Sequence, residues 1–252
     1  MNSADELIEL FQNAEGNALN QDIQLGYDLD FSDANLTFPL GVLTDGTCVV
    51  YTGEFKGNGY SVKGLKMNNT NNVTYQNAGL FCNLENTVIS SLVIDSSCSF
   101  IGDMAGALAV SVTGSLKATN ATNHADVNGK TNVGGLIASM TESKLNSVVL
   151  LENCTNNGKV TGDEWNVGAF FGIMDNSQGV TLTISNSTNS GKVTGKYCIG
   201  GFVGRVFRNP NMVMTILSST NNATITASEN RLGGFVGYIE NSNNMILSIL
   251  NY

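Results

Sequence analysis

The chain has few cations, one histidine and one tryptophan, and these scarcities exclude several classes of function. It carries 12 Lys and Arg against 21 Asp and Glu, which gives a formal net charge of −9 at pH 7. Nucleic acids and anionic membranes both bind clustered cations, so neither is an expected partner. The lone His and the five Cys show no zinc-ligand spacing. We therefore expect no metal, no cofactor and no catalytic residues.

Long apolar runs are also missing. No stretch is long enough to span a membrane, and Met1 leads into a polar segment rather than a signal peptide. We expect no membrane insertion by this segment, with any signal or anchor lying outside it. The odd number of cysteines argues against a complete disulfide framework, so free and mostly buried thiols are expected at all five. They are Cys48, Cys82, Cys98, Cys154 and Cys198.

Asparagine and glycine are abundant, with 34 and 28 residues against only two prolines. Such a chain is rich in turn formers without the compositional bias of disorder, because 42% of its residues are hydrophobic. A length of 252 residues suits one all-β domain with a large core. We expect a single domain over residues 1–252.

A glycine-rich motif repeats along most of the chain. The stretch from Gly200 to Gly204 recurs almost unchanged from Gly233 to Gly237, and weaker copies lie upstream. Its second glycine position recurs at intervals of 27 to 34 residues. The positions are Gly79, Gly106, Gly135, Ala169, Gly201 and Gly234. Short β-like runs at a fixed period are typical of solenoids. The repeat predicts a parallel β-helix with three strands per coil.

A second marker keeps the same register as the glycines. An Asn-rich segment recurs upstream of each later glycine pair, and its central residues are Asn123, Asn156, Asn189 and Asn221. Equivalent residues of a parallel β-helix lie one above another, so these side chains are predicted to form an asparagine ladder with stacked, hydrogen-bonded amides. The threonines that precede them should stack in the same way. Gly135, Gly201 and Gly234 are expected to allow close backbone packing.

The N-terminal part departs from the repeat. Ser3 and Glu6 fit a capping box, and apolar residues then share one helical face, which predicts a short helix from residue 4 to about 14. We expect this helix to cap the first coil, because an open solenoid end exposes core and strand edges. Alternation over residues 23–31 predicts one strand. Residues 1–67 should form the cap and irregular first coils, and residues 68–252 the repeat coils.

The last coil is expected to be truncated, since Asn251 begins another unit. Either the solenoid continues in a longer chain, or the C-terminal edge is available for self-association.

Candidate binding residues lie in turns where the copies differ. They are Asp163, Glu164, Trp165, Arg205 and Arg208. Parallel β-helices include enzymes that cleave acidic polysaccharides, but such sites need convergent carboxylates. Here the position that holds Asp163 alternates in charge between copies, which favours a surface charge ladder.

Seven Asn-x-Ser/Thr sequons are present. Asn120, Asn153 and Asn186 share one repeat position, and glycans do not fit side by side one strand spacing apart, so these three are interpreted as products of the repeat. The credible glycosylation sites are Asn35, Asn68 and Asn72.

Residues 193–204 and 153–162 resemble the glycine-rich GLUG-type repeats of adhesins and surface antigens. Residues 4–11, 55–67 and 77–81 are similar to the start of the immuno-dominant variable surface antigen-like proteins of trichomonad parasites. The resemblance implies a pectin-lyase-like right-handed β-helix and a surface or extracellular role, and it implies no catalytic residues. Ala169 departs from the pattern, because the pair there expects glycine.

Three hypotheses of function follow. The first is a non-enzymatic, surface-exposed adhesive or antigenic module with a protein or glycan ligand. The second is a structural protein that assembles through its C-terminal edge. The third is a carbohydrate-active β-helix enzyme, a lyase or hydrolase.

Overall fold

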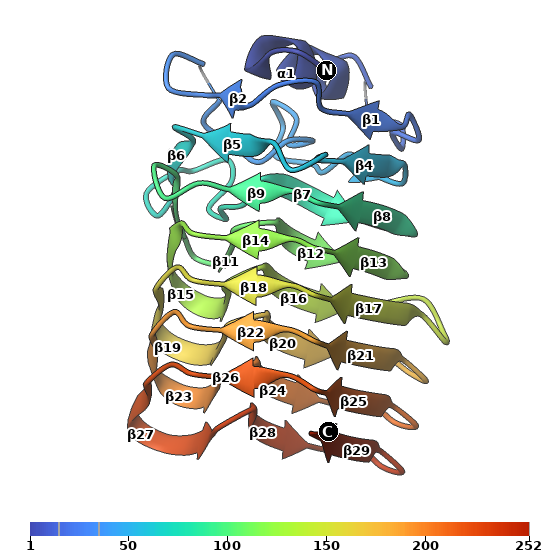
Figure 1. Cartoon of the computed structure of the whole chain (residues 1–252), viewed down its shortest axis with the longest axis vertical. Helices are drawn as coiled ribbons and strands as arrows, with labels where there is room; N and C mark the ends of the chain where they lie inside the picture. The colour runs from blue at the N-terminus through green and yellow to red at the C-terminus, as the bar shows by residue number, and fades with distance from the viewer. Residues whose placement is uncertain (15, 35, 252) are drawn as a thin grey trace.

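A computed structural model describes residues 1–14, 16–34 and 36–251. The chain forms an all-β parallel solenoid of about seven turns with one short helix at its N-terminal end (Figure 1). Successive coils stack along one axis, and the two ends of the chain lie at opposite ends of the stack. The predicted parallel β-helix is therefore confirmed.

Each regular coil contributes one strand to each of four parallel sheets, which we call sheets I to IV in chain order. Sheet I contains β1 (Ile23–Gln24), β4 (Glu54–Lys56), β8 (Thr87–Ser90), β13 (Leu116–Thr119), β17 (Val148–Glu152), β21 (Thr181–Ser185), β25 (Val213–Leu217) and β29 (Ile246–Leu250). Sheet II contains β2 (Leu29–Asp30), β5 (Ser61–Lys63), β9 (Val93–Ile94), β14 (Thr122–Asn123), β18 (Thr155–Asn156), β22 (Thr188–Asn189) and β26 (Thr220–Asn221).

The other two sheets complete the coil. Sheet III contains β6 (Lys66–Asn68), β10 (Ser99–Gly102), β11 (Ala105–Gly106), β15 (Asp126–Gly134), β19 (Val160–Gly168), β23 (Val193–Gly200) and β27 (Ile225–Gly233). Sheet IV contains β3 (Val50–Tyr51), β7 (Phe81–Leu84), β12 (Ala109–Val112), β16 (Ile137–Thr141), β20 (Phe171–Asp175), β24 (Val203–Phe207) and β28 (Val236–Glu240).

The prediction of three strands per coil was wrong, because sheet II adds a fourth. From β9 onward its strands are only two residues long, as in β18, which is too short to produce a period-two pattern. These strands hold the threonines and asparagines of the repeat, and Thr155 pairs with Thr122 and Thr188 on the neighbouring coils. The sequence showed this strand only as a recurring Thr-Asn pair.

The asparagine ladder is confirmed. The side-chain amide of Asn123 donates to the Oδ1 of Asn156 at 2.9 Å, Asn156 donates to Asn189 at 3.0 Å, and Asn189 donates to Asn221 at 2.9 Å. The first three side chains are fully buried. Each amide in the series also bonds a nearby backbone group, as when Asn156 donates to the Gly158 carbonyl at 2.9 Å. The ladder thus satisfies polar groups that lie inside the solenoid.

The repeat glycines and the ladder asparagines recur in the same register because the backbone at Gly135 and at Gly201 packs against an asparagine side chain. A Cβ placed on Gly135 would lie 2.5 Å from the Oδ1 of Asn156 and 2.3 Å from the Ala169 carbonyl oxygen. A Cβ on Gly201 would lie 2.6 Å from the Nδ2 of Asn221. No side chain fits these contacts, so the close packing expected at these two glycines has a direct cause. At Gly234, on the last described coil, nothing lies within 4 Å.

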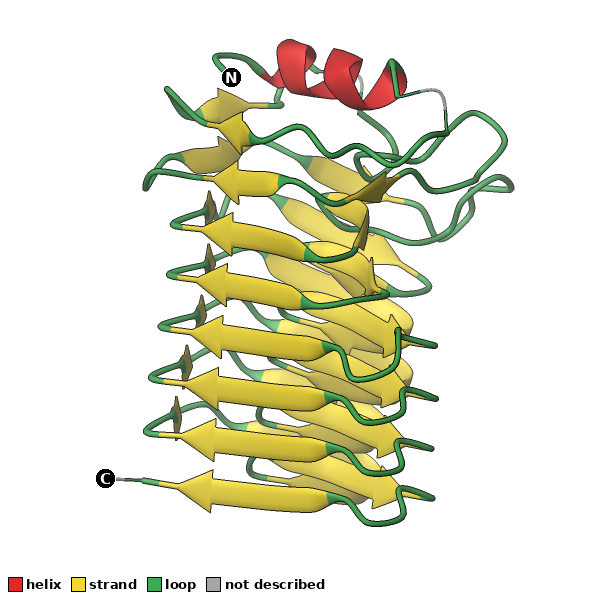
Figure 2. Cartoon of the chain, turned by 90° about the vertical axis from the view of Figure 1, so that its right-hand side faces the viewer, coloured by secondary structure: helices red, strands yellow, loops and turns green. Residues whose placement is uncertain are grey.

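Helix α1 (Ala4–Gln12) covers the N-terminal end of the stack (Figure 2). Ser3 is its N-cap, and its Oγ accepts from the Glu6 backbone N–H at 3.1 Å. Leu7 and Phe11 are buried, and the Phe11 ring lies 5.6 Å from Tyr51 and 5.9 Å from Phe81, measured between ring centroids. The amphipathic face therefore seals the first coil, as the capping prediction required.

The expected strand over residues 23–31 is broken into two strands that belong to different sheets. β1 lies in sheet I and β2 in sheet II, and the chain turns between them. Tyr27 falls at an apolar position of the alternation, which predicts burial, but it lies in this corner and is 65% exposed. Alternation continued across the corner because both strands place every second residue in the core, so the pattern alone did not reveal the turn.

The expectation of five free thiols was wrong for one pair. Cys48 and Cys82 form a disulfide with 5.9 Å between their Cα atoms, while Cys98, Cys154 and Cys198 are free and buried. The two bonded residues are 34 positions apart, close to one repeat length, so the solenoid stacks them on adjacent coils. An odd count excludes pairing of all cysteines but does not exclude one bridge.

Native thiol labelling should therefore fail. Burial raises the pKa of the Cys98 and Cys154 thiols to about 11 from an ordinary 9.0, so a thiol reagent meets almost no exposed thiolate. We expect no adduct on the native chain and three adducts after unfolding without reduction, counted by mass spectrometry. Five adducts would show that the disulfide is absent. The raised pKa of these two thiols also makes the stability of the fold depend on pH. Their contribution to the free energy of unfolding is fully present below about pH 9 and is lost as the pH rises through about 11.

Candidate functional site

Sheet III carries an irregularity that repeats on successive coils. The register between neighbouring strands shifts between Gly129 and Thr131 of β15, between Thr161 and Trp165 of β19, and between Gly195 and Tyr197 of β23. We call the surface formed by residues 128–131, 161–165 and 194–197 the bulge face. A β-bulge bends its strand and redirects side chains, and bulges are over-represented beside functional sites.

Two aromatic rings stack across adjacent coils of the bulge face. The ring centroids of Trp165 and Tyr197 lie 4.3 Å apart with an angle of 19° between the ring planes. Both side chains are half-buried, so part of each ring surface remains in contact with solvent. The Nζ of Lys196 lies 5.4 Å from the centroid of the Tyr197 ring, which places its charge beside the stack.

A shallow hollow of about 420 Å³ lies in sheet III and extends onto the bulge face. Its charged lining residues are Asp103, Lys130, Asp163 and Glu164. Hydroxyl and amide groups line the remainder, together with Ile101, Gly102 and Gly129. Those polar side chains belong to Thr70, Asn128 and Thr161. The hollow thus combines opposite charges with neutral hydrogen-bonding groups.

The charges of the bulge face are not used in ion pairs. Among residues 1–14, 16–34 and 36–251, no ion pair includes Lys130, Asp163, Glu164 or Lys196. The sequence suggested a ladder in which these opposite charges stabilise adjacent coils. The structure places them on adjacent strands but does not bring them into contact, so they are available to a ligand.

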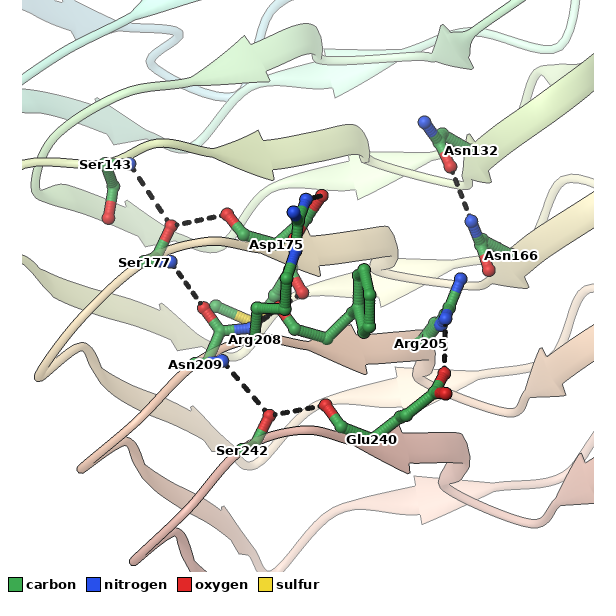
Figure 3. A network of polar contacts seen from close by, with 12 residues as sticks. Asn132, Ser143, Asn166, Asp175, Ser177, Arg205, Arg208, Asn209, Glu240 and Ser242 are labelled. Atoms are coloured by element: carbon green, nitrogen blue, oxygen red, sulfur yellow. Dashed lines mark hydrogen bonds and ion pairs between the residues drawn. The ribbon is translucent and has the colours of Figure 1, made fainter.

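Arg205 and Arg208, the other two predicted binding residues, are engaged in contacts within the chain. Arg208 donates to both carboxylate oxygens of Asp175 at 2.9 and 3.0 Å, and Arg205 pairs with Glu240 (Figure 3). Both guanidinium groups also lie over the Phe207 ring, at 4.1 Å for Arg205 and 4.6 Å for Arg208. Hydrogen bonding to Asp175 raises the pKa of Arg208. These contacts join three successive coils of sheet IV.

A column of small polar side chains runs beside these arginines. The backbone N–H of Ser143 donates to the Oγ of Ser177, that of Ser177 to the Oδ1 of Asn209, and that of Asn209 to the Oγ of Ser242. Figure 3 shows the column on successive turns of the chain. The contacts around Arg205 and Arg208 therefore hold successive coils together, and the bulge face is the better candidate site.

Sequence reasoning missed a second ladder directly beside Trp165. Asn132, Asn166, Cys198 and Arg231 occupy matching positions, and all four have positive φ values between 50° and 67°. The amide of Asn166 donates to the Oδ1 of Asn132 at 2.7 Å, but its own Oδ1 is buried and has no partner among the described residues. The ladder stops where Cys198 replaces asparagine. The recurring Asn-Val-Gly of residues 132–134 and 166–168 could have revealed it.

Replacing Cys198→Asn should extend this ladder. Asparagine tolerates positive φ better than cysteine, and its amide can donate to the orphaned Oδ1 of Asn166. We expect the free energy of unfolding to rise by about 1 kcal/mol, measured by urea denaturation. Cys198→Ala serves as the control, since alanine supplies neither donor nor conformational preference. An equal effect of both substitutions would refute the missing hydrogen bond as the cause.

The three repeat-position sequons are explained by the fold. Asn120, Asn153 and Asn186 are exposed corner residues with φ between 49° and 54°, where asparagine is favoured over most residues. The threonine two positions later belongs to sheet II in each case. Two separate structural needs thus produce the Asn-x-Thr spacing.

The three sequons predicted as glycosylation sites differ in accessibility. Asn68 is exposed at the end of β6, and its Oδ1 accepts from the hydroxyl of Thr70 at 3.0 Å. Asn72 is half-buried, and its Oδ1 accepts from the backbone N–H of Thr74 at 2.8 Å. Asn35 lies outside the described residues. Glycosylation at these three positions stays a prediction, with Asn68 the most accessible of the described pair.

Within the described part of the chain, no group of three or more His, Cys, Asp or Glu side chains could hold a metal ion. Over the same residues, no helix has the length and apolar character needed to cross a membrane.

Comparison with known proteins supports the architecture alone. No family model matches the chain, and no curated protein matches it. A crystal structure from Bacteroides ovatus, of a protein provisionally described as an immunoglobulin A1 protease, superposes with a TM-score of 0.73. The match covers 99% of this chain and 76% of the other at 18% sequence identity. A likeness at this identity shows a shared β-solenoid fold and carries no residue roles.

Proposed function

We propose that the chain is a non-enzymatic binding module of a cell-surface or extracellular protein, and that its bulge face binds a glycan. One observation carries this proposal: the stacked Trp165 and Tyr197 lie beside a hollow whose charged groups form no ion pair with any described residue. Aromatic rings offer apolar surface to the C–H faces of sugars. Carboxylates and ammonium groups form strong hydrogen bonds to hydroxyl groups.

The surface role and the kinship with GLUG-type adhesins and surface antigens are parts of this proposal. Its support is the resemblance of the repeat motifs, together with a rigid scaffold that holds variable turns at fixed spacing. The right-handed, pectin-lyase-like form of the coil is proposed on the same resemblance.

A screen of purified chain against an array of immobilised glycans tests the proposal. We expect binding to at least one class of glycan, and loss of that binding in the Trp165→Ala variant. The Phe207→Ala variant is the matched control, because it removes an aromatic ring from sheet IV rather than from the bulge face. Binding to no glycan, or binding that survives Trp165→Ala unchanged, would overturn the proposal.

The enzymatic alternative is an outcome of the same screen. A glycan that is cleaved on incubation, with activity lost in Asp163→Asn or Glu164→Gln, would make the chain a carbohydrate-active enzyme. The binding proposal expects each bound glycan to be recovered intact, as judged by the absence of new reducing ends and of new unsaturated products.

Self-association is a second candidate function, favoured by the last described coil. Within the described residues, β27, β28 and β29 each have a strand partner on one side only. Their exposed apolar side chains include Leu232, Ile246, Leu247, Ile249 and Leu250. Unpaired strand edges with exposed apolar residues favour pairing with another chain.

The proposed occupant of this coil is a second copy of the chain. An antiparallel pairing of β29 with its own copy about Ser248 sets Ile246 opposite Leu250 and Leu247 opposite Ile249, so that apolar residues match on both faces of the strand. Because α1 covers the opposite end of each copy, this association stops at two copies and gives no filament.

Light scattering over a range of concentrations tests self-association. We expect a dimer that dissociates on dilution, and a monomer for the double variant Ile246→Lys and Leu250→Lys, since paired lysines repel across the interface. Lys117→Ser changes an exposed residue of the same sheet away from this coil and should leave the dimer intact. A wild-type chain that stays monomeric at every concentration would contradict this candidate.

A further inference from the structure

The charges of the bulge face, taken with the matching positions on the coils at either side of it, alternate in sign from coil to coil. Asp103 follows β10, Lys130 lies in β15, Asp163 and Glu164 lie in β19, and Lys196 lies in β23. The corresponding segment of β27 contains Glu229. The sequence of signs along the solenoid axis is therefore negative, positive, negative, positive, negative.

The bulges themselves alternate as well. Relative to its neighbours, β19 contains one additional residue in the bulge, and β27 again contains one more than β23. The additional residue falls in an acidic segment in both cases, at residues 163–164 and 228–229. The two lysine-bearing strands have the shorter bulge. The geometry thus separates acidic positions from basic positions instead of pairing them.

The spacing of these charges fits a polymer that lies along the axis. Neighbouring strands of a sheet are about 4.8 Å apart, so charges of like sign recur roughly every 10 Å. That distance is comparable to the Debye length of about 8 Å at physiological ionic strength, so each charge acts mainly on its immediate surroundings. A ligand that matches the face must present opposite charges in alternation at a similar spacing.

Uniformly charged ligands fit poorly. A polyanion meets Asp103, Asp163 and Glu164 in the hollow, along with a net charge of −9 over the whole chain. A polycation meets Lys130 in the hollow and Lys196 beside the aromatic stack. Like charges brought together at an interface oppose binding, whereas alternating charges are complementary along the whole face.

We propose that the bulge face binds a zwitterionic polysaccharide, in which amino groups and carboxylates alternate along the chain. This inference rests on the glycan-binding function proposed above. The polymer lies parallel to the solenoid axis, its carboxylates reach Lys130 and Lys196, and its amino groups reach Asp103, Asp163 and Glu164. Trp165 and Tyr197 contact its sugar rings.

Three forms of one polymer test the charge pattern. A polysaccharide with alternating amino and carboxylate groups is compared with its N-acetylated form, which is a polyanion, and with its carboxyl-amidated form, which is a polycation. Isothermal titration calorimetry should show that the zwitterionic form binds at least about tenfold more tightly than either derivative at physiological salt. Equal or tighter binding of either derivative would overturn the inference.

Charge reversal locates the interaction. The double variant Lys130→Glu and Lys196→Glu should bind the zwitterionic form at least about tenfold more weakly. The control variant Lys159→Glu and Lys192→Glu makes the same change in net charge at two exposed residues outside the bulge face, which immediately precede β19 and β23. If both variants lose affinity equally, the effect belongs to net charge, and the inference fails.

The outcomes separate this inference from the function on which it rests. Lys130→Glu alone changes an exposed side chain and keeps the test valid if the double variant does not fold. Tight binding of a neutral or uniformly charged glycan, sensitive to Trp165→Ala, would leave the glycan-binding function standing and overturn the ligand class. Binding of no glycan at all would overturn both.

Discussion

A chain in which Leu7→Ser and Phe11→Ser are combined should lose cooperative unfolding or aggregate. The two side chains are 0% and 2% exposed and form the apolar face with which α1 covers the first coil. Truncation of a buried Leu or Phe costs about 2–5 kcal/mol each, and serine adds the burial of a hydroxyl group. The total is comparable to the whole stability of an ordinary domain, about 5–15 kcal/mol.

Thermal unfolding followed by circular dichroism, together with light scattering, measures this effect. Glu9→Ser is the matched control, because Glu9 belongs to the same helix and is exposed. The control should unfold within about 0.5 kcal/mol of the unmodified chain. A double variant that melts as the unmodified chain does would show that the helix is not a cap.

Asn156→Ala should lower the free energy of unfolding by about 3 kcal/mol, the second large effect. Asn156 is fully buried at the centre of the asparagine ladder. Alanine removes its hydrogen bonds to Asn123, Asn189 and the Gly158 carbonyl. It also leaves a void against Gly135, whose lack of a side chain accommodates the amide.

The neighbouring residue provides the control for this substitution. Asn157 is exposed, and among the described residues its side chain hydrogen-bonds only to the His124 ring, at 3.4 Å. Asn157→Ala should therefore change the free energy of unfolding by less than about 0.5 kcal/mol. Urea denaturation of both variants decides the matter, and equal effects would mean that the ladder contributes little to stability.

Much of the architecture could be predicted because it depends on repetition. The parallel solenoid and the asparagine ladder leave signals that recur along the sequence, as at Asn156. The capping helix leaves a capping box, which begins at Ser3. The fourth sheet left only a recurring Thr-Asn pair, since strands of two residues have no periodicity. Corners were hidden where alternation continued through them, as at Tyr27.

The candidate site was predictable only in part. The sequence identified Asp163, Glu164 and Trp165 because the copies disagree there, but it could not show that Tyr197 stacks on Trp165. That contact depends on a register shift between β19 and β23. Lys196 lies beside the Tyr197 ring and forms no ion pair among the described residues, which the sequence also could not show. Variation between copies identified Arg205 and Arg208 equally well, although their partners Asp175 and Glu240 lie on other coils.

Trp165 is the single tryptophan of the chain, so its fluorescence reports directly on the bulge face. The central claim is that a glycan binds at this face, and a titration with the zwitterionic polysaccharide tests it most directly. We predict a saturable change in Trp165 emission with the same midpoint as the calorimetric binding curve, and no change in the Lys130→Glu and Lys196→Glu double variant. Calorimetric binding that leaves the emission of Trp165 unchanged would place the ligand elsewhere and contradict the claim.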